Sequence, residues 1–355
     1  MQSAQGLNPL GQTALSAAER KAWISGCKGP ALTDDERRFF ADERPWGFIL
    51  FARNIADAPQ LQALCAELSA LAGGTVPIFV DQEGGRVQRL RPPLAPVLPA
   101  AKAIGDLYGR DAHAGQQAAF LHGALIAANL KQYGINADCI PCLDIACEDG
   151  HSVIGDRALN DDVQVVALLG RKMAEGAMAG GVLPVMKHIP GHGRANADSH
   201  FNLPHVDATF AELAKTDFLP FAELADLPAA MTAHVLFSAI DPLWPATLSP
   251  TIISQIIRQT IGFDGLLMSD DISMKALKGN LGESAAMAIE AGCDIVLHCN
   301  GDLAEMRAVA GSVPELNGDA AHRAESAMAI IGQPADIPDF ENLWDDYQQL
   351  MALTV

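Results

Sequence analysis

The chain has 355 residues, of which 49% are apolar and 19% charged, so it can bury a large core and is not a disordered chain. Its formal net charge of −19 argues against nucleic acid and against an anionic membrane surface as the main partner. The seven cysteines follow no regular spacing of a disulfide framework. The sequence shows no secretory leader pattern and no run of about 18 apolar residues that could span a membrane. We therefore expect a cytoplasmic protein.

Short apolar segments alternate with longer helical patterns along nearly the whole chain. Glycine and polar residues bound many of the short segments, which is typical of buried strands. Gly134 is expected to end the first clear helix, and Asp161 to begin the next. The predicted strands are 23–27, 46–51, 77–82, 135–141, 182–188, 229–235, 265–271 and 294–300. The clearest predicted helices are 111–133, 161–180, 208–226, 249–261 and 282–291.

Eight apolar strands separated by helices predict an α/β protein with a (β/α)8 TIM barrel. A doubly wound open sheet is the alternative, but no glycine-rich phosphate fingerprint follows the first strand, which favours the barrel. No linker or low-complexity stretch divides the chain. We therefore expect residues 1–355 to form a single catalytic domain, with residues 315–355 as terminal helices packed outside the barrel.

Polar residues repeatedly follow the predicted strands. In TIM barrels the catalytic groups project from the C-terminal ends of several strands. Burying polar groups there costs free energy unless they have hydrogen-bonding or charged partners, or bind a ligand. This pattern predicts an active site at that end of the barrel. The residues concerned are Asp81 and Glu83, Arg157, Lys187 and His188, His234, and Asp270 and Asp271.

The fourteen residues 187–200, KHIPGHGRANADSH, hold three histidines, a lysine and an aspartate. Asp198 lies two residues before His200, and such a pair is a plausible acid/base dyad because the carboxylate can hold the imidazole in one tautomer. The alternative is a polar loop whose histidines only satisfy local hydrogen bonds.

Two consecutive aspartates, Asp270 and Asp271, end the seventh predicted strand. Successive strand residues point to opposite faces, so we expect only one carboxylate to enter the barrel mouth and the other to pair outside it. An ionised carboxylate near cations can act as a nucleophile or as an electrostatic stabiliser. Together with Lys187, His188 and the arginines of 81–90, this set is suited to binding sugar hydroxyls, so a small carbohydrate is the predicted substrate.

Four segments together carry a family resemblance: DQEGGRVQRL (81–90), VIGDRAL (153–159), KHIPGHGRANADSH (187–200) and GLLMSDDIS (265–273). They resemble glycoside hydrolase family 3, and within it the single-domain β-N-acetylglucosaminidases that recycle bacterial cell-wall fragments. The resemblance extends over roughly residues 20–310. It implies a retaining exo-glycosidase acting on terminal β-linked N-acetylglucosamine, with muropeptide fragments as substrates.

Carried over position by position, the resemblance implies that Asp270 is the nucleophile and that His200, supported by Asp198, is the general acid/base. The imidazole then replaces the second carboxylic acid of most retaining glycosidases. No cofactor is implied. A phosphorylase that uses phosphate in place of water, and a non-catalytic sugar-binding barrel, are the alternatives. The residues implied to bind the sugar are Asp81, Arg89, Arg157, Lys187 and His188.

The spacing of Cys139, Cys142, Cys147 and His151 superficially resembles a zinc motif. Because Cys139 and Cys142 should face opposite sides of a strand, we expect buried apolar thiols and no metal. Asp144 is expected to stabilise its loop rather than to take part in catalysis. His192, His234 and His298 fit either a place in the pocket or a structural role.

Overall fold

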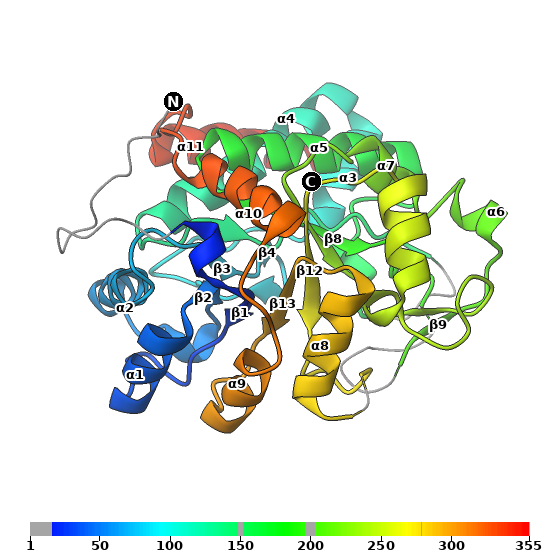
Figure 1. Cartoon of the computed structure of the whole chain (residues 1–355). Helices are drawn as coiled ribbons and strands as arrows, with labels where there is room; N and C mark the ends of the chain where they lie inside the picture. The colour runs from blue at the N-terminus through cyan, green and yellow to red at the C-terminus, as the bar shows by residue number, and fades with distance from the viewer. Residues whose placement is uncertain (1–15, 148–151, 196–202, 278, 355) are drawn as a thin grey trace, which may run out of the picture.

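The computed structural model describes residues 16–147, 152–195, 203–277 and 279–354, and its strands form a parallel barrel (Figure 1). The order of the nine strands is β7-β6-β3-β2-β1-β13-β12-β10-β8. The two end strands, β7 and β8, are halves of one predicted strand, separated only by Val185, so the sheet closes on itself with eight strand positions. The predicted (β/α)8 barrel is confirmed.

The barrel strands are short, and their C-terminal ends all point to one mouth because every pairing between them is parallel. They are β1 (Lys21–Ser25), β2 (Pro45–Ile49), β3 (Ile78–Val80), β6 (Ala137–Asp138), β7 (Leu183–Pro184), β8 (Met186–Ile189), β10 (Ala229–Thr232), β12 (Leu266–Asp271) and β13 (Ile295–His298). Two small sheets lie outside the barrel: β4 (Gln82–Gly84) with β5 (Val87–Gln88), and β9 (His205–Val206) with β11 (Leu236–Phe237).

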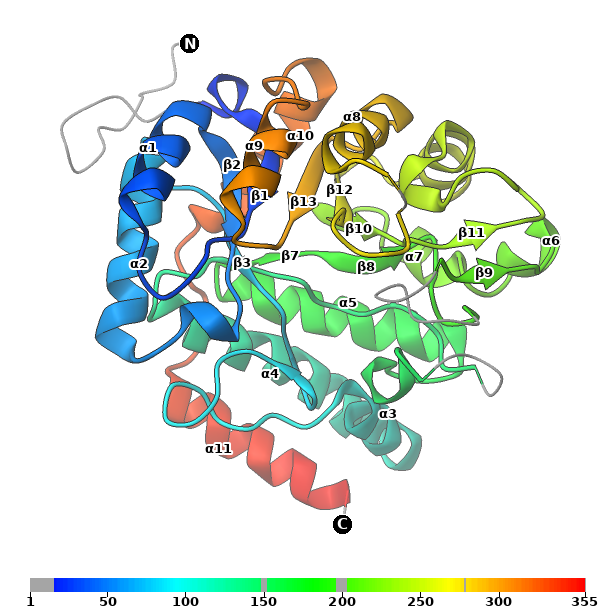
Figure 2. The ribbon, with the colours of Figure 1, turned by 90° about the horizontal axis from the view of Figure 1, so that it is seen from below.

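Helices surround the barrel in Figure 2, with α4 and α5 packed side by side. None of the helices in the described ranges is long and apolar enough to cross a membrane. The helices are α1 (Asp34–Glu43), α2 (Ala58–Leu71), α3 (Ala101–Arg110), α4 (Ala112–Lys131), α5 (Val163–Ala179), α6 (Phe210–Leu213), α7 (Leu219–Glu223), α8 (Leu281–Ala291), α9 (Leu303–Ala310), α10 (Gly318–Ile331) and α11 (Phe340–Met351), with a π-helix at Ile252–Thr260.

Two helix predictions need correction. The helix predicted to start at Asp161 begins two residues later, at Val163, because Asp162 is its N-cap and accepts the backbone N–H groups of Gln164 and Val165. The single helix predicted over 208–226 is two short helices, α6 and α7. Pro220 is one of the first two residues of α7, where its missing N–H costs nothing, whereas it would interrupt a continuous helix.

The C-terminal residues have two different packing roles. Side chains of α10, among them Ala324 and Ile331, belong to the apolar cluster that fills the barrel interior. The segment just before α10 bonds the beginning of β1, so α10 covers the end of the barrel opposite the mouth. Helix α11 packs on α4 instead, where the Tyr347 hydroxyl hydrogen-bonds the buried His122 ring at 2.8 Å.

Candidate active site

A cavity of about 300 Å³ opens at the C-terminal ends of the strands. This is the place that the sequence pattern predicts for the active site, and the volume suits a small ligand. Side chains from most of the strands line it, many of them charged. The charged and histidine residues that line it are Asp81, Glu83, Arg86, Arg89, Arg157, Lys187, His188, His192, Asp270 and Asp271.

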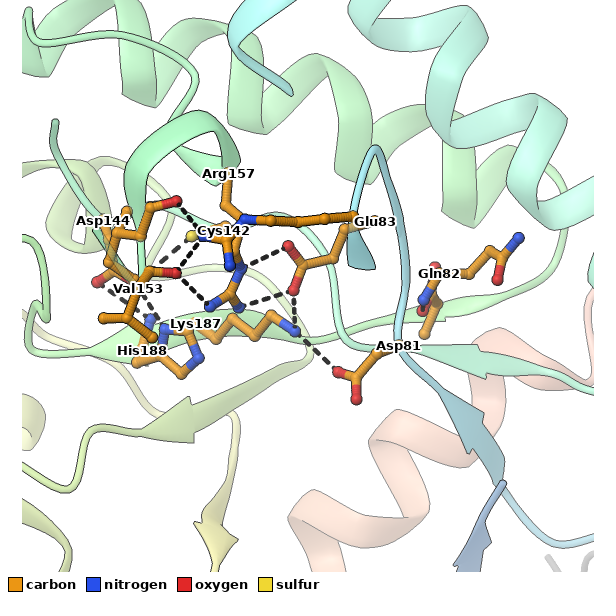
Figure 3. Close-up of polar contacts among 12 residues, drawn as sticks. Asp81, Gln82, Glu83, Cys142, Asp144, Val153, Arg157, Lys187 and His188 are labelled. Carbon is orange, nitrogen blue, oxygen red and sulfur yellow. Dashed lines mark hydrogen bonds and ion pairs between the residues drawn. The ribbon is translucent and has the colours of Figure 1, made fainter. Parts of the chain in front are cut away.

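The Lys187 ammonium joins two carboxylates at the wall of the cavity (Figure 3). Its Nζ lies 2.9 Å from Asp81 Oδ1 and 2.6 Å from Glu83 Oε1. Lys187 comes from β8, whereas Asp81 and Glu83 follow β3, so the contact joins two strand positions that β6 separates in the sheet. Only 1% of Lys187 is exposed, which means that the ammonium is stable there because these carboxylates compensate its charge.

Two arginines extend this network. Arg157 binds Glu83 through two parallel hydrogen bonds of 2.9 and 2.8 Å, from Nε and Nη2. Arg89 donates from Nη2 to Asp81 Oδ2 at 3.0 Å. A bidentate arginine–carboxylate pair fixes both partners in orientation as well as in distance. The result is a rigid ring of charge in which each carboxylate lies between two cations.

The charges of this ring are stable at neutral pH. Burial alone would raise the pKa of Glu83, but Arg157 and then Lys187 lower it to about 2. The pKa of Asp81 lies below its usual range because Lys187 and Arg89 outweigh the effect of burial. Burial would lower the pKa of Lys187, yet Asp81 and Glu83 hold it above its usual value. The ring therefore presents fixed donors and acceptors to a ligand.

Asp270 ends β12 and lines the same cavity. Its Oδ1 accepts the backbone N–H of Asp271 at 2.8 Å. Burial opposes ionisation, but the neighbouring His234, His188 and Lys187 and this hydrogen bond lower the pKa of Asp270. Asp270 is thus an ionised carboxylate at the cavity wall, which is the state that a nucleophile requires.

The Asp271 side chain is used locally, although the residue also lines the cavity. Its carboxylate accepts hydrogen bonds from the Ser273 backbone N–H at 3.0 Å and hydroxyl at 2.7 Å, and from the Cys299 backbone N–H at 3.2 Å. As expected, this carboxylate is paired. The expectation that Asp271 lies outside the mouth is wrong, because its partners are at the mouth end of the neighbouring β13.

His188 is held by Asp144 at the cavity wall. The ring Nδ1 lies 2.5 Å from Asp144 Oδ2, and the two residues are 44 positions apart in the sequence. Asp144 Oδ1 accepts the backbone N–H of His192 at 2.6 Å. Burial would raise the pKa of Asp144, but His188 and His192 lower it. Asp144 therefore fixes both the ring of His188 and the backbone of the PGHG turn at His192.

His200 and Asp198 lie outside the described residues. The chain leading toward them is anchored at two points. Arg194 Nε donates a hydrogen bond to Asp217 Oδ2 at 2.6 Å. The backbone of Gly193 lies so close to Ile145 that a Cβ added to this glycine would be 2.0 Å from the Ile145 carbonyl oxygen. These contacts hold Gly193 against Ile145 and Arg194 against Asp217.

The three undecided histidines separate into two groups. His192 lines the cavity, with its ring 5.7 Å from that of His188, and burial lowers its pKa to about 4. His234 and His298 are fully buried and are not among the residues lining the cavity. His234 bonds the Thr247 hydroxyl at 2.7 Å and the Asp271 carbonyl at 3.0 Å, which places it behind the strand end.

Sequence reasoning placed Glu83 among the polar strand-end residues of the site but gave it no role, and it expected Asp144 only to stabilise its loop. Glu83 is the carboxylate shared by Arg157 and Lys187, and Asp144 is the partner of His188. Its position two residues after Asp81 at a strand end placed Glu83 near the site, but no sequence pattern showed that it pairs with Arg157 and Lys187. No local pattern marks Asp144, since its partner comes from another strand.

Comparison with known proteins identifies the family of this chain. Residues 18–331 match the family described as Glycosyl hydrolase family 3 N terminal domain. A Beta-hexosaminidase of Bordetella avium is 40% identical over 277 residues, which are 77% of this chain and 78% of that protein. The structure of NagZ from Neisseria gonorrhoeae in complex with N-trifluoroacetyl-D-glucosamine superimposes with a TM-score of 0.82 at 33% identity, covering 94% of this chain and 97% of that one.

A glycoside hydrolase family 3 β-N-acetylglucosaminidase from Paenibacillus has the same TM-score, 0.82, at 29% identity. It covers 95% of this chain, which spans 68% of the longer protein. Sequence and structure therefore agree, and the chain is a glycoside hydrolase that belongs to glycosyl hydrolase family 3.

Proposed function

We propose that the protein removes terminal non-reducing β-linked N-acetylglucosamine from small carbohydrates, muropeptide fragments in particular, and that it retains the configuration at the anomeric carbon. The observation that carries this proposal is an ionised Asp270 at the wall of a 300 Å³ cavity that is ringed by paired charges. Such a cavity offers one nucleophile and several fixed hydrogen-bonding groups to one sugar ring.

The proposed reaction has two displacements at the anomeric carbon. In the first, an Asp270 carboxylate oxygen attacks this carbon while its bond to the leaving oxygen breaks, and His200 gives that oxygen a proton. In the second, His200 takes a proton from water, the water oxygen attacks the same carbon, and the bond to Asp270 breaks. Asp198 holds the His200 imidazole in the required tautomer and stabilises its charged form.

The charged ring is proposed to bind the sugar hydroxyls. Lys187 has three ammonium protons, of which Asp81 and Glu83 take two, so a third is available for a hydroxyl. His188 uses Nδ1 for Asp144, which leaves Nε2 to face the cavity that the residue lines. Arg89 and Arg157 hold the two carboxylates in place. A ring built for one sugar favours exo-action over internal cleavage.

The choice of N-acetylhexosamine rests on the relatives. The similar proteins are named Beta-hexosaminidase, and a similar solved structure holds an N-acylated glucosamine analogue. Their similarity extends over most of this chain. A role in recycling cell-wall fragments agrees with the cytoplasmic location expected from the sequence.

Covalent trapping tests the proposal. A fluorinated N-acetylglucosaminide with an activated leaving group should label Asp270, and peptide mass spectrometry should locate the adduct. An adduct on Asp271 or Glu83 would contradict the assignment. Product analysis with and without phosphate then separates the hydrolase from the phosphorylase, because only the latter releases a sugar 1-phosphate.

A further inference from the structure

The strand segment that carries Asp270 is held by an interrupted backbone ladder. On one side, β10 pairs with β12 (Figure 2) only as far as Met231 and Met268. On the other side, β13 pairs with Met268 and then with Asp271, and β12 has one residue more than β13 between these two pairs. Such an extra residue is a β-bulge, which re-aims side chains and often lies beside active sites. Asp270 therefore lies in a bulge, where regular strand pairing does not fix its backbone.

A histidine side chain continues the contact between β10 and β12 beyond the end of this ladder. His234 follows β10, and its ring Nε2 lies 3.0 Å from the backbone carbonyl oxygen of Asp271. Asp271 is the residue after the bulge, and its own N–H donates to Asp270 Oδ1 at 2.8 Å. Burial raises the pKa of Asp270, and His234 is the neighbour that lowers it most. The ring thus lies close to the Asp270 carboxylate and holds the residue that binds it.

The hydrogen bonds around the ring determine where its proton lies. A carbonyl oxygen can only accept, so Nε2 carries the proton and donates it to Asp271. In the neutral ring Nδ1 is then an acceptor, and the Thr247 hydroxyl lies 2.7 Å from it. The Ala233 carbonyl oxygen, at 3.1 Å, is the more distant acceptor for the same hydroxyl. The Thr247 proton therefore points to His234.

A second threonine completes this network. Thr232 Oγ1 lies 2.8 Å from Thr247 Oγ1, and Thr232 is the donor because Thr247 uses its only proton for the ring. Thr232, Thr247 and His234 are fully buried, and an unpaired polar atom there would cost free energy. A one-way series of hydrogen bonds thus runs from Thr232 through Thr247 and His234 to the Asp271 carbonyl, and such series strengthen each member.

We propose that His234 is a positioning residue for the nucleophile and that Thr247 sets the tautomer in which it acts. The Nε2–H bond fixes the Asp271 backbone, which keeps the Asp271 N–H on Asp270 Oδ1 and leaves the second carboxylate oxygen for attack on the anomeric carbon. In the other tautomer two lone pairs would face each other between Nε2 and the carbonyl, and the bulge would shift. His234 does not line the cavity, so it acts through Asp271 and not on the sugar. The inference rests on the proposed function, because it needs Asp270 as the nucleophile.

Isosteric substitutions separate the tautomer from simple packing. Thr247→Val keeps the size of the side chain but removes the proton donor, and Thr247→Ser keeps the hydroxyl. The matched control is Thr232→Val, which removes a hydroxyl from the same network one hydrogen bond further from the ring. His234→Phe removes both ring nitrogens, whereas the amide of His234→Gln can donate from near the Nε2 position. The measured quantities are kcat and KM on the aryl glycoside that the wild type cleaves fastest.

We expect T247V to lower kcat about tenfold, as for the loss of one buried hydrogen bond. H234F should lower kcat about 10²-fold, as for a displaced reacting group, and H234Q should recover part of this loss. KM should stay within about threefold of the wild type in all variants, because the charged ring that binds the sugar is unchanged. T247S and T232V should keep kcat within about twofold. A T247V turnover equal to that of T232V would overturn the role of Thr247, and it does so even if H234F fails to fold.

Nitrogen NMR of protein labelled with ¹⁵N-histidine reports the tautomer directly. The His234 resonances are assigned by their loss in H234Q. In slightly alkaline solution, Nε2 should be protonated and Nδ1 unprotonated in the wild type and in T232V, and T247V should show a mixture of the two tautomers. A protonated Nδ1 and an unprotonated Nε2 in the wild type would overturn the proposal.

The double variant Asp270→Asn/His234→Phe tests whether His234 acts through Asp270. We expect H234F to cost less than about twofold in the D270N background, because the group that it positions is already lost. Additive losses would overturn the proposal. Near-normal turnover of D270N would overturn the nucleophile and this inference together. A D270N variant with strongly reduced turnover, combined with normal turnover of T247V and H234F, would overturn the inference alone.

Discussion

Replacement of Lys187 by Met tests whether the charged ring at the barrel mouth holds the site together. The variant keeps the length and apolar stem of the side chain but removes the ammonium that lies 2.9 Å from Asp81 and 2.6 Å from Glu83. At an effective dielectric constant of about 20, each contact is worth about 6 kcal/mol of attraction. The desolvation of the buried ions opposes this gain, so the expected loss of unfolding free energy is about 3–5 kcal/mol near pH 7.

The pH dependence of this loss has a defined sign. In the wild type, burial alone would raise the pKa of Asp81, but Lys187 and Arg89 lower it. A carboxyl whose pKa is lower in the folded than in the unfolded chain stabilises the fold at pH values above its unfolded-state pKa. Without the ammonium, the carboxyls of Asp81 and Glu83 should have raised pKa values, which destabilise the variant most at neutral pH. Below about pH 4 the carboxyls are protonated in the unfolded chain as well, and this penalty disappears. The difference between variant and wild type should therefore be smaller near pH 4 than near pH 7.

Urea denaturation followed by circular dichroism at the two pH values measures this difference. Lys172→Met is the matched control, because Lys172 pairs with Glu175 near the surface, and its loss should change the unfolding free energy by less than about 1 kcal/mol. If K187M loses no more unfolding free energy than the control variant, or if its loss does not depend on pH, the paired charges do not hold the ring together.

Three further predictions concern the chemistry. Asp270→Asn should lower turnover by about 10³-fold or more while the circular dichroism spectrum stays native, and near-normal activity would exclude Asp270 as the nucleophile. His200→Ala should slow the cleavage of glycosides with poor leaving groups far more than that of activated aryl glycosides, because only the former need a proton on the leaving oxygen. Asp198→Ala should show a smaller effect of the same kind. Equal losses of turnover on both substrate types would mean that His200 only positions the substrate. The wild type should cleave an aryl N-acetylglucosaminide faster than the aryl glucoside, and the reverse order would show that the substrate is wrong even if the mechanism is right.

Much of the architecture could be predicted because it depends on local patterns. The apolar segments ending in Asp81, Lys187 and Asp270 are strands in the structure, and their polar ends meet because parallel barrel strands share one mouth. The helix over 208–226 was predicted wrongly because the apolar pattern is continuous there, whereas Pro220 marks a new helix start that the pattern does not reveal. The roles of Asp270, His200 and Asp198 stay predictions, and the latter two residues lie outside the described ranges.

The sequence by itself determined which residue types gather at the barrel mouth, since strand period and strand order place them there. Only the tertiary structure decided how they pair. Glu83 lies between Lys187 and Arg157, and Asp144 binds His188, across separations of 44 to 104 positions that no spacing rule connects. The same holds for His234, which follows β10 closely but is fully buried, bonds the Asp271 carbonyl and does not line the cavity. Pairing depends on which side chains closure of the barrel brings within about 3 Å, and closure is a property of the whole chain.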